Sequence, residues 1–345
     1  MAGSVERALL ERVWADPLAD DPRRVLADWW LARGDPRGEF VTLQLDRARG
    51  RRQLEALVRE QALLAEHREA WLGPLAGSVG EVVFERGFPA RAVLQLGRPP
   101  AGGSLRDPAW ATVVELFAHN WRDVDVTNVL ARLLAGPCTH LSRLAAPLSS
   151  LLTLTDGPRR AWTGVVVTDL SWSPEDLVTL SARLPALDTI GVATCYAGWV
   201  RGLCGAALRR RIRRLELVVE DDLHGTTSGF TELFAAVEPA WFDELLCFDA
   251  SAGVGLVVGP GEAGRMSAIL AHPFAIDESL LGSPVADRFD PITLIWAPGE
   301  DGCEEEAAEL VRALGSRVRV AGPGATSLGP FSGSLPPSPW GEPPP

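Results

Sequence analysis

A short apolar pattern, L-x-x-L-x-L, recurs through the middle of the chain and limits the possible fold more than any other feature. Its central positions are separated by about 20 to 30 residues, and helix-like segments such as 174–185 lie between copies. One copy is too small to bury its apolar face alone, so neighbouring copies must stack. The pattern predicts an α/β fold in which a divergent leucine-rich-repeat-like solenoid with parallel strands spans 106–250. The copies are Ala111/Val114/Leu116, Leu141/Leu144/Ala146, Trp162/Val165/Val167, Leu187/Ile190/Val192, Ile212/Leu215/Leu217 and Phe242/Leu245/Cys247.

The segment before the repeats is expected to be helical. Apolar residues there recur with the spacing of one helical face. Asp21 precedes Pro22 and Asp35 precedes Pro36, and each pair has the sequence of a helix N-cap followed by the first helical residue. These signals predict a helical module over 1–75.

The tripeptide Arg33-Gly34-Asp35 is expected to be a corner between two helices. Gly34 favours the left-handed conformation that ends a helix, and the Asp35 carboxylate can accept from the first N–H groups of the next one. The tripeptide is then no adhesive loop. An ion pair between Asp28 and Arg37 across this corner is a further hypothesis.

The remaining segments divide by composition. A strand, a turn around Gly-Phe-Pro at 87–89 and a second strand are predicted for 76–105. Strands followed by Pro-Gly turns in 251–321 indicate either divergent repeats or an α/β cap. The stretch 322–345 is rich in Pro, Gly and Ser and is expected to be a disordered tail.

The charge of the chain argues against a nucleic-acid partner. The net charge is −12, and the segment 238–309 carries many acidic residues but only Arg265 and Arg288 as basic ones. Nucleic-acid affinity comes mainly from cations that neutralise phosphates. A basic protein partner is one interpretation of this acidic segment, and solubility is the other.

The cysteines and the N-terminus indicate where the chain functions. The five cysteines form no CxxC pair, which favours reduced thiols over a disulfide framework or a zinc ribbon. No apolar run is long enough to span a membrane, and the N-terminus lacks the apolar region of a signal peptide. We expect a cytoplasmic protein without a membrane contact, a metal site or a cofactor.

One motif favours an alternative function. Residues 259–264 read G-x-G-x-x-G after an expected strand and before a helical stretch, as in dinucleotide-binding sites. Glu262 would oppose a phosphate there, and a similar turn recurs at 298–302. A nucleotide-binding protein or enzyme that uses this motif remains an alternative.

The repeats also predict where a partner would bind. In a solenoid of this kind, side chains between the apolar positions point outward from the strands. An arginine-rich run at 209–214 forms either a surface of local salt bridges or a contact for an acidic group. The candidate partner-binding residues are Glu115, Arg143, Val166, Thr189, Glu216 and Leu246 on the strands, and Arg210 and Arg213 in the arginine run.

The N-terminal sequence resembles a known family. The stretch 8–44 is similar to the repeat-companion domain, an N-terminal module found before leucine-rich-repeat-like arrays in myxobacterial and planctomycete proteins. The residues that carry the resemblance include Pro17, Arg24, Ala27-Asp28-Trp29, Arg33 to Phe40 and Gln44, followed by Arg86-Gly87-Phe88. Trp30 and Leu31 depart from the family pattern and predict an unusual apolar surface. The resemblance implies a repeat scaffold and no known catalytic residues.

Together these features predict a non-catalytic scaffold, adaptor or sensor that binds a protein partner through a repeat surface. Aromatic and arginine side chains would anchor the contact. A structural subunit of a larger assembly is the second alternative, beside the nucleotide-binding one.

Overall fold

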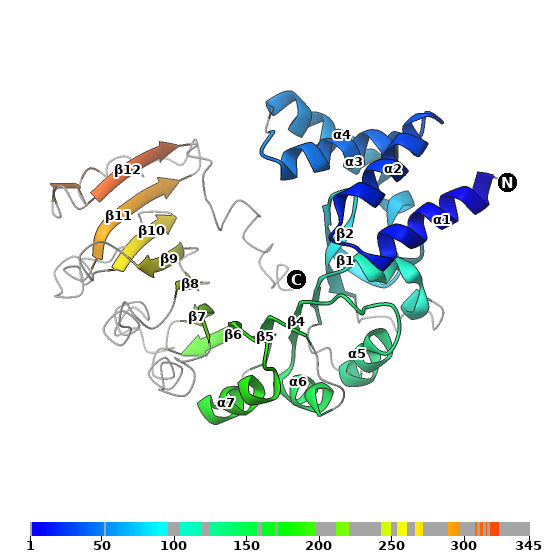
Figure 1. The fold of residues 1–345 in the computed structure, drawn as a ribbon. Helices are drawn as coiled ribbons and strands as arrows, with labels where there is room; N and C mark the ends of the chain where they lie inside the picture. Colours follow the sequence, from blue (N-terminus) through cyan, green and yellow to red (C-terminus); the bar gives the residue numbers. More distant parts are fainter. Residues whose placement is uncertain are drawn as a thin grey trace, which may run out of the picture. The chain divides into compact units, whose positions relative to one another are not determined.

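The computed structural model forms two compact units, 1–162 and 163–345, and each is described here by itself. The boundary falls inside the segment 106–250. Figure 1 shows the elements of both units. The structure describes residues 2–51, 53–95, 104–118, 125–156, 161–169, 172–196, 212–220, 243–249, 254–260, 266–271, 289–296, 308, 311–312, 315 and 318–323.

The first unit begins with four α-helices, which confirms the helical reading of its sequence. They are followed by a short 3₁₀ helix at Gly73–Leu75 and by four strands with two further helices. The α-helices are α1 (Ala2–Ala15), α2 (Asp20–Leu31), α3 (Pro36–Ala48), α4 (Leu54–Leu72), α5 (Val126–Leu134) and α6 (Leu148–Thr155). The strands are β1 (Val79–Glu85), β2 (Phe88–Leu94), β3 (Glu115–Phe117) and β4 (Arg143–Ala146).

The helix corner forms as its sequence predicts. Gly34 adopts φ +70°, and the Asp35 carboxylate accepts the backbone N–H of Arg37 at 2.9 Å. Pro36 is the first residue of α3. The other predicted cap is wrong, because α2 already begins at Asp20 with Ala19 as its N-cap. A proline two residues later is still within the first turn, where its missing N–H costs nothing.

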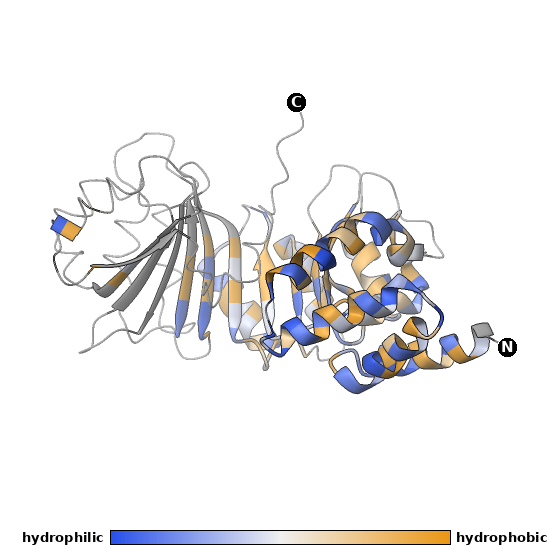
Figure 2. Cartoon of the chain, turned by 90° about the horizontal axis from the view of Figure 1, so that it is seen from above, coloured by the Kyte–Doolittle hydropathy of each residue, from blue (hydrophilic) through white to orange (hydrophobic). Residues whose placement is uncertain are grey.

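Helices α2 and α3 pack at unusually short range because α3 carries a glycine at the contact. A Cβ on Gly38 would lie 2.6 Å from the Ala27 carbonyl oxygen and 2.7 Å from the Leu31 nitrogen. The buried cluster around this contact includes residues of α1, α2, α3 and β2. Its members are Val13, Leu26, Ala27, Trp30, Val41, Leu45 and Phe88. Figure 2 shows the matching alternation of hydrophobic and hydrophilic residues around these helices.

Strands β1 and β2 pair antiparallel and form the predicted strand-turn-strand element. The turn is one residue earlier than expected, at Arg86 (φ 52°) and Gly87 (φ 88°), and Phe88 already belongs to β2. Two successive positive φ values are typical of a two-residue type I′ hairpin. Gly87 is required for a second reason, since a Cβ there would meet the Val41 Cγ2 atom at 2.2 Å.

Strands β2, β3 and β4 pair in parallel, and α5 and α6 lie side by side. Leu116 is in register with Leu144, and both side chains are fully buried. The first copy of the repeat pattern was therefore placed two residues too early. Val114, its expected central residue, is only half-buried.

The second unit is an α/β structure with an eight-stranded, mostly parallel open sheet. Its strands follow the order of the sequence. The strands are β5 (Gly164–Val167), β6 (Thr189–Tyr196), β7 (Arg214–Glu220), β8 (Glu244–Asp249), β9 (Val254–Pro260), β10 (Met266–Ala271), β11 (Phe289–Trp296) and β12 (Val318–Pro323), and α7 (Pro174–Arg183) lies between β5 and β6.

The central apolar positions of the pattern are in register across the first four of these strands. Val165 pairs with Ile190, Ile190 with Leu215, and Leu215 with Leu245. All four side chains are at most 3% exposed. This part of the sequence prediction is confirmed, because each pattern copy contributes a buried residue at the same level of the sheet.

The parallel order is interrupted after β8. Strand β9 pairs antiparallel with both β8 and β10, and the parallel arrangement resumes with β10, β11 and β12. The segment 251–321 thus adds strands to the same sheet of the second unit.

Within the described residues, none of the helices combines the length and the apolar character that crossing a membrane requires.

Candidate functional site

The predicted partner-binding residues of the second unit lie in two parallel rows across the strands. One row contains Gly164, Thr189, Arg214 and Glu244. The second contains Val166, Gly191, Glu216 and Leu246. Residues two apart on a strand share a face, so both rows lie opposite the buried residues of the pattern. We call the surface formed by these two rows the strand face.

The strand face is partly open, and its charges are paired. Thr189, Arg214, Glu216, Glu244 and Leu246 are all half-buried. The Arg214 guanidinium contacts the carboxylates of Glu216 and Glu244, each with an N···O distance of 3.0 Å. These contacts hold three side chains in fixed positions on neighbouring strands.

A glycine makes the strand face flat beside Val166. The Val166 side chain lies over Gly191, where an added Cβ would be 2.8 Å from the Val166 Cγ2 atom. Gly191 is buried although it has no side chain. A larger residue at position 191 would displace the Val166 side chain.

The predicted residues of the first unit form a shorter row with alternating charge. Arg91, Glu115 and Arg143 are in register on β2, β3 and β4, and all are half-buried. Phe117 and Ala145, two residues further along, are buried. Only the beginning of these strands is therefore open to a partner.

Of the arginine run, the structure describes Arg213 and Arg214, whereas Arg210 lies outside the described residues. The Arg213 guanidinium is exposed and donates to the Asp243 carboxylate at 2.6 Å. The Arg213–Asp243 contact is a local salt bridge, which was one of the two interpretations of the arginine run.

The glycine motif at 259–264 differs from a dinucleotide site in its connection. Gly259 and Pro260 end β9 and are paired with Ser267 and Met266 of β10. A dinucleotide site needs a helix after the glycines, to direct backbone N–H groups at the phosphates. The expected helical stretch is instead an antiparallel strand, and residues 261–264 lie outside the described part.

The corner after α2 holds a buried aromatic and cationic cluster. Trp30 is 1% exposed, so the expectation that it forms an apolar surface is wrong; Leu31 is 46% exposed. The Trp30 Nε1 donates to the Glu6 carboxylate at 3.0 Å. Trp30 is buried because α1 and Phe88 of β2 cover it, which no local helical spacing could predict.

Arg37 belongs to the same cluster, and the proposed Asp28–Arg37 ion pair is wrong. The Arg37 guanidinium carbon lies 4.8 Å from the Trp30 ring centroid and 4.9 Å from that of Phe88. Cation–π contacts of this kind stabilise a cation away from water. Burial lowers the pKa of Arg37 to about 10, which leaves it charged at neutral pH.

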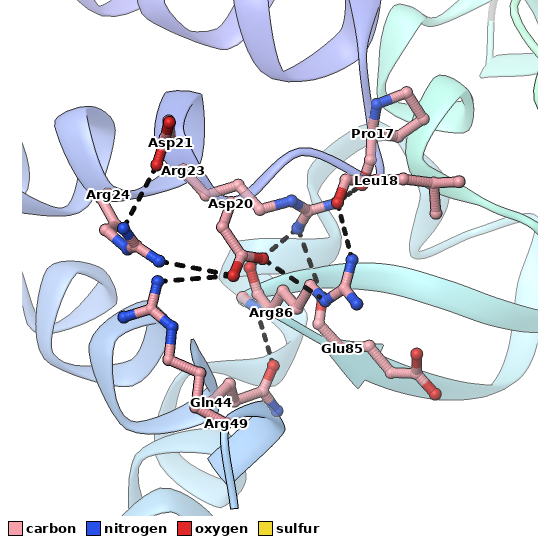
Figure 3. A network of polar contacts seen from close by, with 11 residues as sticks. Pro17, Leu18, Asp20, Asp21, Arg23, Arg24, Gln44, Arg49, Glu85 and Arg86 are labelled. Atoms are coloured by element: carbon pink, nitrogen blue, oxygen red, sulfur yellow. Dashed lines mark hydrogen bonds and ion pairs between the residues drawn. The ribbon is translucent and has the colours of Figure 1, made fainter. Parts of the chain in front are cut away.

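A polar network joins α2 to the hairpin. The Asp20 carboxylate lies 3.5 Å from Arg24, 3.5 Å from Arg49 and 3.6 Å from Arg86 (Figure 3). Beside it, the buried Arg23 donates to the carbonyl oxygens of Pro17, Glu85 and Arg86. Burial, and then the Arg86 charge, lower the pKa of Arg23 to about 10. This network has a structural role, since its donors mostly reach backbone oxygens or a shared carboxylate.

Gln44 ties the third helix to the same hairpin. Its Oε1 accepts the Gly87 N–H at 2.6 Å, and its Nε2 donates to the Phe84 carbonyl at 3.0 Å and to Glu60 at 2.9 Å. The side chain is 2% exposed. Every hydrogen-bonding atom of this amide therefore has a partner inside the unit.

Three charged residues of the strand surfaces were not among the predicted partner-binding residues, although Arg214 belongs to the arginine run that the sequence singled out. Arg214 and Glu244 precede the central apolar residue of their strands, and Arg91 lies on β2, outside the repeat pattern. The signal for Arg214 and Glu244 was present in the alternation of polar and apolar residues along β7 and β8.

No protein-family model matches the chain, and no curated protein matches it.

Proposed function

We propose that this chain is a non-catalytic scaffold that binds a protein partner through the strand face. In this proposal β3 to β8 and α5 to α7, all within 106–250, belong to a divergent leucine-rich-repeat-like array, and the N-terminal helices are a repeat-companion module before it. An adaptor or a sensor would use the same surface.

One observation supports this proposal above the others. The strand face presents Thr189, Arg214, Glu216, Glu244 and Leu246 in two rows on three neighbouring strands. Parallel strands fixed by a buried opposite face make a broad and rigid surface. Such a surface suits a macromolecule better than a small ligand, because it offers many contacts without a deep hollow.

The N-terminal contacts support the proposed module. The residues that carry the resemblance have packing or capping roles: Asp35 caps α3, Gly38 permits the α2–α3 contact, and Gln44 holds the hairpin. In the Arg-Gly-Asp tripeptide, the Arg33 guanidinium lies 3.7 Å from the Trp29 ring centroid. These roles favour a scaffold module over an adhesive or catalytic loop.

The proposed partner is a protein with complementary charge. The strand face carries two carboxylates, Glu216 and Glu244, against the single guanidinium of Arg214, so its net negative charge fits basic groups of a partner. The neighbouring Asp243 is neutralised by Arg213. We place the scaffold in the cytoplasm, a proposal that rests on the absence of a cysteine pairing pattern in the sequence and is compatible with the free, buried thiol of Cys138.

The proposal is tested by affinity purification of the full chain from native lysate. The strand-face variant Glu216→Arg/Leu246→Arg is compared with Leu54→Arg/Glu55→Arg, which makes the same chemical changes at exposed positions of α4. We expect the wild type and the α4 variant to retain one stoichiometric protein, and the strand-face variant to lose it.

Circular dichroism first verifies that both variants are folded. If the wild type retains no stoichiometric protein in repeated trials, or if the strand-face variant retains it fully, the proposed function is wrong.

A further inference from the structure

The first unit contains a pocket apart from the strand face. It lies where the 3₁₀ turns at Ser104–Arg106 and Pro108–Thr112 meet the C-terminal end of α5. Its volume is about 550 Å³, within the range of small-molecule sites. The lining residues are Leu105, Arg106, Pro108, Arg132, Ala135, Gly136 and Pro137.

The lining residues that the structure describes are apolar except for two cations, Arg106 and Arg132. Both arginines are exposed, and neither forms an ion pair or a side-chain hydrogen bond in the part of the chain that the structure describes. The nearest carboxylate in sequence, Asp107, accepts the Ala109 N–H at 2.9 Å.

Two unpaired cations at one pocket are unexpected in a chain with net charge −12. Arg132 lies in the last turn of α5, where a cation is favoured by the helix dipole. That effect accounts for Arg132. It does not account for Arg106, which ends the 3₁₀ turn at Ser104–Arg106. A guanidinium group presents a planar fork of N–H donors that matches a carboxylate.

The walls of the pocket are held by contacts behind it. The Trp110 Nε1 donates to the Ser104 carbonyl at 2.8 Å, and the Ser104 hydroxyl lies 2.8 Å from that of Ser78. On the other side, the Gly136 N–H donates to the Leu133 carbonyl at 3.1 Å and the Cys138 thiol contacts the Trp110 carbonyl at 3.7 Å. The backbone segments around the pocket are therefore held in place without a ligand, which reduces the entropy lost on binding.

We propose that this pocket binds a small organic carboxylate with an apolar body. The apolar part lies against Leu105, Pro108 and Pro137, and the carboxylate accepts hydrogen bonds from Arg106 and Arg132. The proposal does not depend on the protein-binding function of the strand face.

The test measures binding of 4-phenylbutyrate to the full chain by isothermal titration calorimetry. The neutral amide of the same skeleton, 4-phenylbutyramide, and the cation 4-phenylbutylamine serve as ligand controls. We expect saturable binding of the carboxylate, with the amide at least about tenfold weaker and the amine without binding, because charge-assisted hydrogen bonds are lost.

Variants separate the pocket from general charge effects. Arg106→Ala and Arg132→Ala should each weaken carboxylate binding about tenfold. Arg12→Ala removes an exposed arginine from the last turn of α1 and should leave binding unchanged. Ala135→Leu narrows the pocket without a charge change and should weaken binding.

Thermal unfolding verifies that each variant is folded. The proposal is overturned if the carboxylate does not bind saturably, if the amide binds equally well, or if the Arg106 and Arg132 variants bind like Arg12→Ala.

Discussion

The N-terminal helices together with the β1–β2 hairpin, called the N-terminal module, depend on their sequence in a different way from the strand sheet of the second unit. In the module, single residues have contacts that no other residue type could make, such as Gly87 under Val41 or Gln44 between three partners. In the sheet, Val165, Ile190, Leu215 and Leu245 need only be apolar and in register. The module therefore depends on residue identity and the sheet on residue pattern. Substitutions in the two regions should therefore differ in their effect on stability.

The largest effect is expected for Gly87→Ala in the module. The alanine must keep a positive φ of 88°, and its Cβ would meet Val41 Cγ2 at 2.2 Å. Backbone strain and overpacking together should lower the free energy of unfolding by about 4 kcal/mol. Chemical denaturation followed by tryptophan fluorescence measures the change. Gly77→Ala, where a Cβ meets nothing within 4 Å, is the control and should change little.

In the sheet, Leu215→Ala should cost about 3 kcal/mol through the cavity it leaves, whereas Leu215→Ile should cost less than about 1.5 kcal/mol. Leu215 is 3% exposed between Ile190 and Leu245. The same denaturation experiment measures both variants. Equal and large losses for both would contradict the idea that the sheet requires pattern alone.

Gln44→Leu should lower the free energy of unfolding by about 2 kcal/mol. Leucine fills a similar volume, but the Gly87 N–H and the Phe84 carbonyl would stay buried without this partner. Gln61→Leu on the exposed side of α4 is the matched control. If both variants unfold like the wild type, residue identity at position 44 is not what holds the hairpin.

Gly191→Ala tests whether the sheet also contains a position that depends on identity. Its Cβ would lie 2.8 Å from Val166 Cγ2, at a side chain that can shift, so we expect a loss of about 1 kcal/mol. The double variant Val166→Ala/Gly191→Ala should lose less than the sum of the two single variants, because the contact is then relieved. Additive losses, measured by denaturation of all three, would exclude this contact as the cause.

The sequence predicted those features that local chemistry decides. Gly34 and Asp35 are enough to place the helix corner, and alternation is enough to find the buried residues of β5 to β8. Two features depend on distant partners and were missed. Trp30 is buried because Phe88 lies against it, and the position of β3 is set by its pairing with β4.

The candidate site could be predicted to the same extent. The strand positions Glu216 and Leu246 follow from alternation, and they lie in register. The alternation of polar and apolar residues could also have placed Arg214 and Glu244 on this face. The ion pair between them could not be predicted, because it depends on side-chain geometry that the pattern does not contain. Which partner binds depends on surface shape and charge, not on the buried pattern.

The smallest effect is expected for the exposed ion pair between Glu39 of α3 and Arg59 of α4, where the two carboxylate oxygens face the guanidinium at 2.8 and 2.7 Å. The hydrogen bonds from Arg59 hold the pKa of Glu39 below its ordinary value of 4.5.

A depressed pKa in the folded state means that the pair stabilises the module above about pH 5, and that this contribution disappears as the pH falls through the lowered pKa. Both side chains are largely solvent-accessible, so salt and water reduce the gain. Thermal unfolding of the wild type and of Glu39→Gln should differ slightly at pH 7, and this difference should shrink as the pH is lowered. Arg7 and Glu11 on α1 form another exposed ion pair, so Glu11→Gln is the control for Glu39→Gln. A difference between wild type and Glu39→Gln that grows on acidification would contradict the sign of this prediction.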